Sequence, residues 1–138
     1  MQGSHLVAEL YGCPADTPAM TDPAALRRLC VESVQASGLH AVAELFHRFE
    51  PTPAAGPAGI TGVVLLAESH LAVHTWPEHG TVTLDVYVCN RDADCRDAAE
   101  ALMTRLIGHF APRDIRRQAW ARGPVVPLSP SATDEPTR

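Results

Sequence analysis

The chain has 138 residues, which suits one folded domain with a hydrophobic core and is too short for two. Its formal net charge is -5, and its basic residues are scattered rather than clustered, so we expect a small cationic ligand and no nucleic-acid partner. No apolar stretch approaches the length of a membrane span and the N-terminus lacks a signal-peptide pattern, so we expect a cytoplasmic protein with no membrane partner. The four cysteines form no CxxC pair, and we expect free thiols.

Alternation of apolar and polar residues over positions 5–11 predicts a first strand that closes at Gly12. A helix follows, because Asp22 before Pro23 is a typical helix start and Gly38 supplies a stop. One face of this helix is apolar and consists of Leu26, Leu29, Cys30 and Val34.

A second strand is predicted over residues 39–49, where the side chains alternate. Residues 50–59 are rich in Pro, Ala and Gly, which predicts a loop. The continuous apolar run over residues 60–67 then predicts a strand that is buried on both faces.

Two further strands, over residues 69–75 and 81–89, are joined by five residues, which leaves room only for an antiparallel turn. Asp92 or Asp94 is expected to cap a second helix, which ends at Pro112. The buried face of that helix is predicted to be Ala99, Leu102, Met103, Leu106 and Phe110. A last strand is expected over residues 115–122.

This order of elements predicts an α+β fold, a two-layer sandwich in which an antiparallel sheet carries both helices on one face. We expect a single domain over residues 1–123 and a disordered tail over 124–138, where prolines and small polar residues gather. The other face of such a sheet needs a partner if water does not cover it. With 46% hydrophobic residues, the chain is expected to form a homodimer.

Chemically versatile side chains crowd around the strands at 69–75 and 81–89, namely Glu68, Ser69, His70, His74, Glu78, His79 and Cys89. Three interpretations are open: a zinc site from the histidines, a nucleophile with a histidine base, or ordinary strand and loop polarity. A strand would separate His70 from His74 by about 13 Å, so zinc is not favoured for that pair. Spacing alone favours ordinary polarity.

The segment ESHLAVHTWPE at 68–78, followed by DVYVC at 85–89, resembles the processing and active-site segment of the prokaryotic S-adenosylmethionine decarboxylase family. The resemblance extends to HL at 5–6, LYGC at 10–13, HRF at 47–49 and TGV at 61–63. It covers roughly residues 5–123.

The resemblance implies that the chain cuts itself between Glu68 and Ser69, giving a β chain of residues 1–68 and an α chain of residues 69–138. Serine suits this reaction because its hydroxyl attacks the preceding carbonyl and later leaves by elimination. His74 is implied to handle a proton transfer in this processing, and Thr61 occupies a position where the family commonly has a serine hydroxyl. Ser69 and His74 have opposite parity on a strand, so we expect a bend at Ser69 that brings it within reach of His74.

The cofactor implied is a pyruvoyl group derived from Ser69, with no metal and no pyridoxal phosphate. The substrate amine would form an imine with it, which withdraws electrons from the bond to the carboxylate. Cys89 would then supply the proton, and its predicted position on the polar side of its strand suits that role.

For the substrate, the resemblance implies that Phe49 stacks on adenine and that Glu78 holds the ribose hydroxyls. Trp76 is a further candidate wall, because an aromatic face attracts a sulfonium cation. The resemblance also implies a homodimer of cleaved protomers with shared active sites, working in polyamine (spermidine) synthesis.

Several positions depart from the family pattern. The loop between Phe49 and Thr61 is longer, TVT stands at 81–83, and Asn90 replaces a more typical glycine. None of these departures removes a processing residue, but several of them lie near the substrate pocket. Two alternatives therefore stay open: the same chemistry on ornithine or arginine, or an unprocessed homologue that binds a ligand or pairs with an active subunit.

Overall fold

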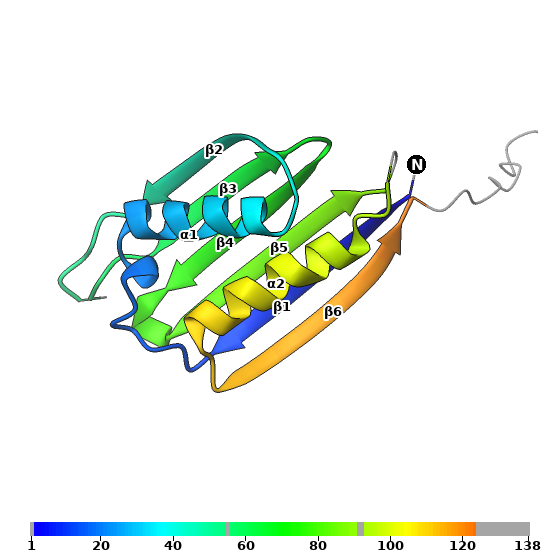
Figure 1. Cartoon of the computed structure of the whole chain (residues 1–138). Helices are drawn as coiled ribbons and strands as arrows, with labels where there is room; N and C mark the ends of the chain where they lie inside the picture. Colours follow the sequence, from blue (N-terminus) through cyan, green and yellow to red (C-terminus); the bar gives the residue numbers. More distant parts are fainter. Residues whose placement is uncertain (1, 55, 91–92, 124–138) are drawn as a thin grey trace, which may run out of the picture.

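The computed structural model describes residues 2–54, 56–90 and 93–123. Six antiparallel strands form one sheet, and two helices cover one of its faces (Figure 1). In chain order the elements are β1 (Gly3–Tyr11), η1 (Pro18–Met20), α1 (Pro23–Ala36), β2 (Ala41–Arg48), β3 (Ile60–Leu66), β4 (Ser69–Trp76), η2 (Pro77–His79), β5 (Thr81–Cys89), α2 (Arg96–Phe110) and β6 (Asp114–Arg122). The predicted two-layer α+β sandwich is confirmed.

The strands follow the order β2-β3-β4-β5-β1-β6 across the sheet. Hairpins join β2 to β3, β3 to β4 and β4 to β5, while β1 enters between β5 and β6. The β3–β4 turn and the end of β5 therefore lie at one end of the sheet, which we call the hairpin end. The β2–β3 connection and η2 lie at the other, which we call the loop end (Figure 1).

Helix α1 begins where the sequence predicts, because the Asp22 carboxylate accepts a hydrogen bond from the amide of Ala24 at 3.0 Å. Helix α2 begins at Arg96, whose amide donates to Asp94 at 3.0 Å. Asp92, the other predicted cap, lies outside the described residues. The predicted tail after Gly123 also lies outside them.

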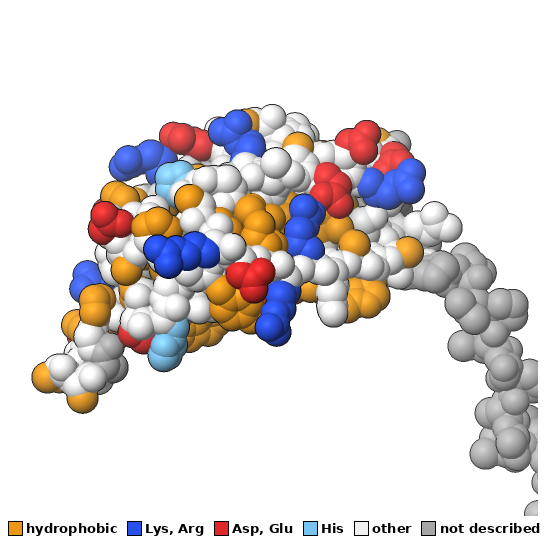
Figure 2. Space-filling model, turned by 90° about the horizontal axis from the view of Figure 1, so that it is seen from below, with side chains coloured by type: hydrophobic (Ala, Val, Ile, Leu, Met, Phe, Trp, Pro, Cys, Tyr) orange, Lys and Arg blue, Asp and Glu red, His pale blue; other side chains and the backbone are white. Residues whose placement is uncertain are grey.

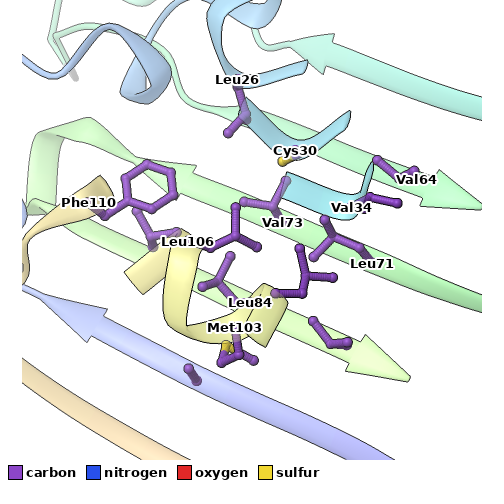
Figure 3. Packing of buried hydrophobic residues seen from close by; sticks show 14 of the residues in the cluster. Leu26, Cys30, Val34, Val64, Leu71, Val73, Leu84, Met103, Leu106 and Phe110 are labelled. Atoms are coloured by element: carbon purple, nitrogen blue, oxygen red, sulfur yellow. The ribbon is translucent and has the colours of Figure 1, made fainter. Parts of the chain in front are cut away.

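The core lies between the helices and the sheet (Figure 3). Leu26, Cys30 and Val34 of α1 and Met103 and Leu106 of α2 are fully buried. They pack on every second residue of the central strands, as the period of a pleated strand requires. Facing them from the sheet are Val64, Leu71, Val73, Val82, Leu84 and Val86.

Strand β3 is not buried on both faces, so that prediction is wrong for the single chain. Val64 and Leu66 pack against the helices, but Leu65 is 47% exposed because no element within the described residues covers the opposite face. The alternation in β2 is also interrupted, since a register shift between Ala41 and Ala43 puts Ala41 on the core side with Phe46.

We call the sheet face away from the helices the outer face. Large apolar side chains are exposed on it, namely Leu45, Leu65, Trp76 and Trp120. Basic and acidic side chains are interspersed with hydrophobic ones on the side of the molecule seen in Figure 2. Among the described residues, no helix has the length and apolar character needed to cross a membrane.

Candidate functional site

The predicted cleavage point lies in the tight β3–β4 turn, where Leu66 pairs with Ser69 and only Ala67 and Glu68 separate the strands. Glu68 has a φ of 60°, in the left-handed region that side-chain-bearing residues rarely adopt. Holding a non-glycine residue there costs about 1 kcal/mol. The bend expected at the Glu68–Ser69 bond is therefore present, and the bond follows a strained residue.

Ser69 meets the end of β5. Its Oγ accepts a hydrogen bond from the backbone amide of Cys89 at 3.0 Å. Both residues are partly exposed, and Cys89 has the strand parity of Asp85 and Tyr87 on the outer face. The structure thus brings Ser69 and Cys89 together at the hairpin end, as the sequence predicts.

His74 and Thr61 lie at the loop end instead. The two residues are paired across β3 and β4, and Thr61 Oγ1 lies 3.1 Å from His74 Nδ1. His74 is five residues from Ser69 along one strand, or about 16 Å at a rise of roughly 3.3 Å per residue. The expectation that Ser69 is within reach of His74 is wrong within one chain, because the bend lies before Ser69 and β4 continues regularly after it.

The predicted substrate residues gather with His74 and Thr61. Phe49, Trp76 and Glu78 line one cavity of about 390 Å³ at the loop end, within the size range of small-molecule sites. The ring centroids of His74 and Trp76 are 5.9 Å apart. Gly59 shapes this cavity, since a Cβ there would lie 1.9 Å from the carbonyl oxygen of Thr75.

The sequence did not single out Glu50 or the loop that follows Phe49 as cavity walls. The cavity is lined by Phe49, Glu50, Pro51, Thr52, Gly56, Pro57, Ala58, Gly59, Ile60, Thr61, His74, Thr75, Trp76 and Glu78. A loop rich in proline and glycine has no periodicity that could point its side chains at a site. The long loop therefore adds a second carboxylate, Glu50, to the cavity that Glu78 also lines.

The sequence also did not predict a cluster of three polar side chains, His5, His70 and Asp85, on the outer face. Asp85 Oδ1 lies 2.8 Å from His5 Nε2 and 3.1 Å from His70 Nε2. The Tyr87 ring packs beside both histidine rings, with centroid distances of 5.9 Å to His5 and 5.8 Å to His70. The three polar residues come from β1, β4 and β5, so only the strand order, which the sequence does not state, brings them together.

The other cysteines show no comparable arrangement. All four thiols are free, as expected. Cys30 is buried in the core, and burial raises its pKa from 9.0 to about 12. Burial also raises the pKa of Cys13. Cys95 is partly exposed at the start of α2.

A family model described as S-adenosylmethionine decarboxylase matches residues 4–123. A relative named S-adenosylmethionine decarboxylase proenzyme, from Aquifex aeolicus, is 37% identical over 123 residues, covering 89% of this chain and 82% of that protein. The relative of the same name from Pyrococcus furiosus is 36% identical over 109 residues, covering 79% and 73%.

A solved structure agrees with these relatives. The crystal structure of the adenosylmethionine decarboxylase from Aquifex aeolicus superposes with a TM-score of 0.77 at 36% identity. The match covers 93% of this chain and 96% of that chain. The similarity thus includes the whole sheet, both helices and both ends of the outer face.

Proposed function

Because the chain belongs to the S-adenosylmethionine decarboxylase family, we propose that it cuts its own Glu68–Ser69 bond and decarboxylates S-adenosylmethionine. The observation that carries this proposal is the contact between Ser69 Oγ and the Cys89 amide beside the strained Glu68. It joins Ser69, the proposed self-cleaving serine, to the backbone of Cys89, whose thiol is the proposed catalytic acid.

The precursor geometry supports self-cleavage. Glu68 strains the turn, and the Cys89 amide fixes the direction of the Ser69 hydroxyl next to it. Attack by Oγ on the Glu68 carbonyl forms an ester and frees the Ser69 nitrogen. Elimination then releases Oγ within the Glu68 carboxylate, and one water replaces the nitrogen, which leaves as ammonia.

The resulting pyruvoyl group would be the cofactor, and it supplies an electron sink for the bond that loses carbon dioxide. The residues present suit it, because Ser69 is partly exposed at the start of β4 and the Cys89 backbone is in direct contact with it. A small substrate can therefore approach this chain end while the Cys89 thiol supplies a proton.

The cavity at the loop end suits the rest of the substrate. Phe49 and Trp76 present aromatic faces, which stack on adenine and attract a sulfonium cation. Glu78 lines the same cavity and can accept hydrogen bonds from ribose hydroxyls. The cavity is also acidic, since Glu50 joins Glu78, and a basic amino acid such as ornithine or arginine is the second candidate substrate.

We further propose that two chains form a homodimer with shared active sites. Ser69 and Cys89 lie at the hairpin end, whereas His74 and the cavity lie at the loop end of the same sheet. Two outer faces can stack symmetrically in two ways: the two-fold axis between the sheets runs either parallel to the strands or perpendicular to them. Only the axis across the strands puts the loop end of one chain over the hairpin end of the other.

The outer face has the character that such a partner needs. Leu45 is 71% exposed and Trp120 is 48% exposed, whereas Val64, Leu71, Val73 and Leu84 on the helix side of the central strands are buried. Two sheets that stack in this way enclose a layer of side chains about 10 Å thick. The dimer would therefore bury the apolar residues of both outer faces and assemble two complete sites.

The test begins with the purified protein on a denaturing gel, beside a Ser69→Ala variant. We expect two fragments that meet at residue 69, with a blocked N-terminus on the α chain, and one intact band for the variant. One intact band from the unmodified chain after long incubation would contradict the proposal. It would favour an unprocessed homologue.

Release of labelled carbon dioxide then identifies the substrate. We expect release from carboxyl-labelled S-adenosylmethionine and none from labelled ornithine or arginine. Release from either basic amino acid alone would show that the acidic character of the cavity, rather than its aromatic walls, determines the choice of substrate.

A further inference from the structure

The cluster of His5, His70 and Asp85 is placed directly behind the cleavage point. His70 is the residue after Ser69, so its backbone nitrogen would carry the new pyruvoyl group. Its side chain leaves β4 on the outer face and contacts Asp85 of β5 at 3.1 Å. Asp85 in turn contacts His5 of β1 at 2.8 Å. One carboxylate oxygen thus connects the start of β4 to two other strands.

The proton positions in this cluster follow from its neighbours. Arg122 Nη1 lies 3.4 Å from His5 Nδ1, and a guanidinium can only donate. His5 Nδ1 must therefore accept, which leaves the ring proton on Nε2, where it is donated to Asp85. An ionised carboxylate only accepts, so His70 Nε2 also donates to Asp85.

Aromatic packing holds the cluster in place. The rings of His5, His70 and Tyr87 contact one another, and the Arg122 guanidinium stacks over Tyr87 at 4.7 Å. Gly3 makes room for Tyr87, since a Cβ there would lie 2.8 Å from the tyrosine ring. The two histidines and the aspartate are thus fixed before cleavage and involve no residue that cleavage removes.

Cleavage, by contrast, removes two restraints that act on Ser69. The covalent link through the turn to β3 is broken. The hydrogen bond from the Cys89 amide to Ser69 Oγ is also lost, because that oxygen leaves with the Glu68 carboxylate. The new chain end keeps its backbone pairing, but terminal residues of strands fray unless they are held.

We propose that Asp85 is a positioning residue that holds His70, and with it the newly formed end of β4, against β5 after self-cleavage. This inference rests on the proposed function. The clamp acts at the first residue after the pyruvoyl group and ties it to the strand that ends in Cys89. It therefore keeps the reacting carbon at the end of β5, next to the Cys89 backbone, in the mature protein, whereas the intact precursor needs no clamp because the turn holds Ser69.

The test compares Asp85→Ala with the unmodified chain in two backgrounds, the cleaving chain and the uncleavable Ser69→Ala chain. We expect Asp85→Ala to cleave normally, with kcat for decarboxylation lowered by about 10- to 100-fold and KM little changed. Hydrogen exchange at the amides of residues 70–72 should become about 10-fold faster in the cleaved protein only. Asp85→Asn keeps an acceptor oxygen and should restore most of both properties.

Glu44→Ala is the matched control, because it removes a carboxylate that accepts from Arg27 at 2.8 Å on another strand of the sheet. It should change neither kcat nor exchange at residues 70–72. Unchanged kcat and exchange in Asp85→Ala would overturn the clamp, as would faster exchange in both backgrounds, which indicates a purely structural role. If Asp85→Ala does not fold, unchanged behaviour in His70→Ala would overturn it as well. Failure of the unmodified chain to cleave would instead overturn the proposed function.

Discussion

At the scale of single residues, we propose two separate roles for Cys89, one for its backbone amide and one for its thiol. The Cys89 backbone amide orients the Ser69 hydroxyl before cleavage, and any residue at position 89 except proline supplies that amide. The thiol is needed only later, as the proton donor of the proposed decarboxylation. Cleavage and catalysis should therefore respond differently to substitution at this position.

Cys89→Ala tests this separation. We expect the variant to cleave to completion, because its backbone amide is unchanged. The rate of decarboxylation should fall by at least about 100-fold, because the general acid is missing. Cys95→Ala, at the partly exposed start of α2, is the matched control and should keep full activity. A Cys89→Ala variant that decarboxylates normally would remove the thiol from the mechanism.

Two kinds of residue could not be assigned from the sequence: those whose partners come from distant strands, and those in a loop without periodicity. Ser69, Cys89, Thr61 and His74 were identified from the resemblance, but the pairing of Thr61 with His74 across β3 and β4 was not predicted. Asp85 could not be assigned, because its contacts with His5 and His70 exist only once β1 lies beside β5. Glu50 could not either, because its loop follows no periodic pattern.

At the scale of elements, local signals predicted most of the fold. Asp22 and Pro23 start α1, and the alternation over β5 separates its buried face from its polar face, as the structure confirms. Leu65 was predicted to be buried but is exposed. A continuous apolar run shows that a strand is hydrophobic, but it does not show whether a second layer covers that face. The register shift in β2 likewise depends on its neighbour β3 and has no local signal.

Helix α1 gives a prediction on the pH dependence of stability. Burial raises the Cys30 pKa from 9.0 to about 12, so above pH 9 the unfolded chain releases a proton that the folded chain retains. The contribution of this thiol to stability is fully present below pH 9 and is lost as the pH rises towards 12. Denaturant unfolding in the uncleavable Ser69→Ala background should therefore show stability constant below pH 9 and falling as the pH rises from 9 towards 12.

Cys30→Ala in the same background isolates the contribution of the thiol. The variant should be less stable at neutral pH by about 1 kcal/mol because it leaves a small cavity. Its stability should nevertheless fall less steeply with pH than that of the parent. Equal slopes for the two proteins would show that Cys30 does not titrate differently on folding.

At the scale of the whole molecule, the candidate residues lie in two groups at opposite ends of the sheet, which we propose are halves of one site. The hairpin end holds Ser69 and Cys89, and the loop end holds His74 with the aromatic and acidic cavity. A regular strand cannot shorten the distance between them, because its rise is fixed by backbone geometry. The account therefore depends on a second chain, which the exposed apolar residues of the same face are suited to bind.

The most direct measurement is complementation between two inactive chains. Ser69→Ala and His74→Ala chains with different tags are co-expressed, and the heterodimer is isolated by tandem affinity purification. In a shared site, the intact Ser69 of the His74→Ala chain meets the intact His74 of the other chain. We predict that the His74→Ala chain, uncleaved when alone, is cleaved in the heterodimer, with about half the activity of the unmodified dimer. If that chain stays intact in the heterodimer, the shared site is contradicted.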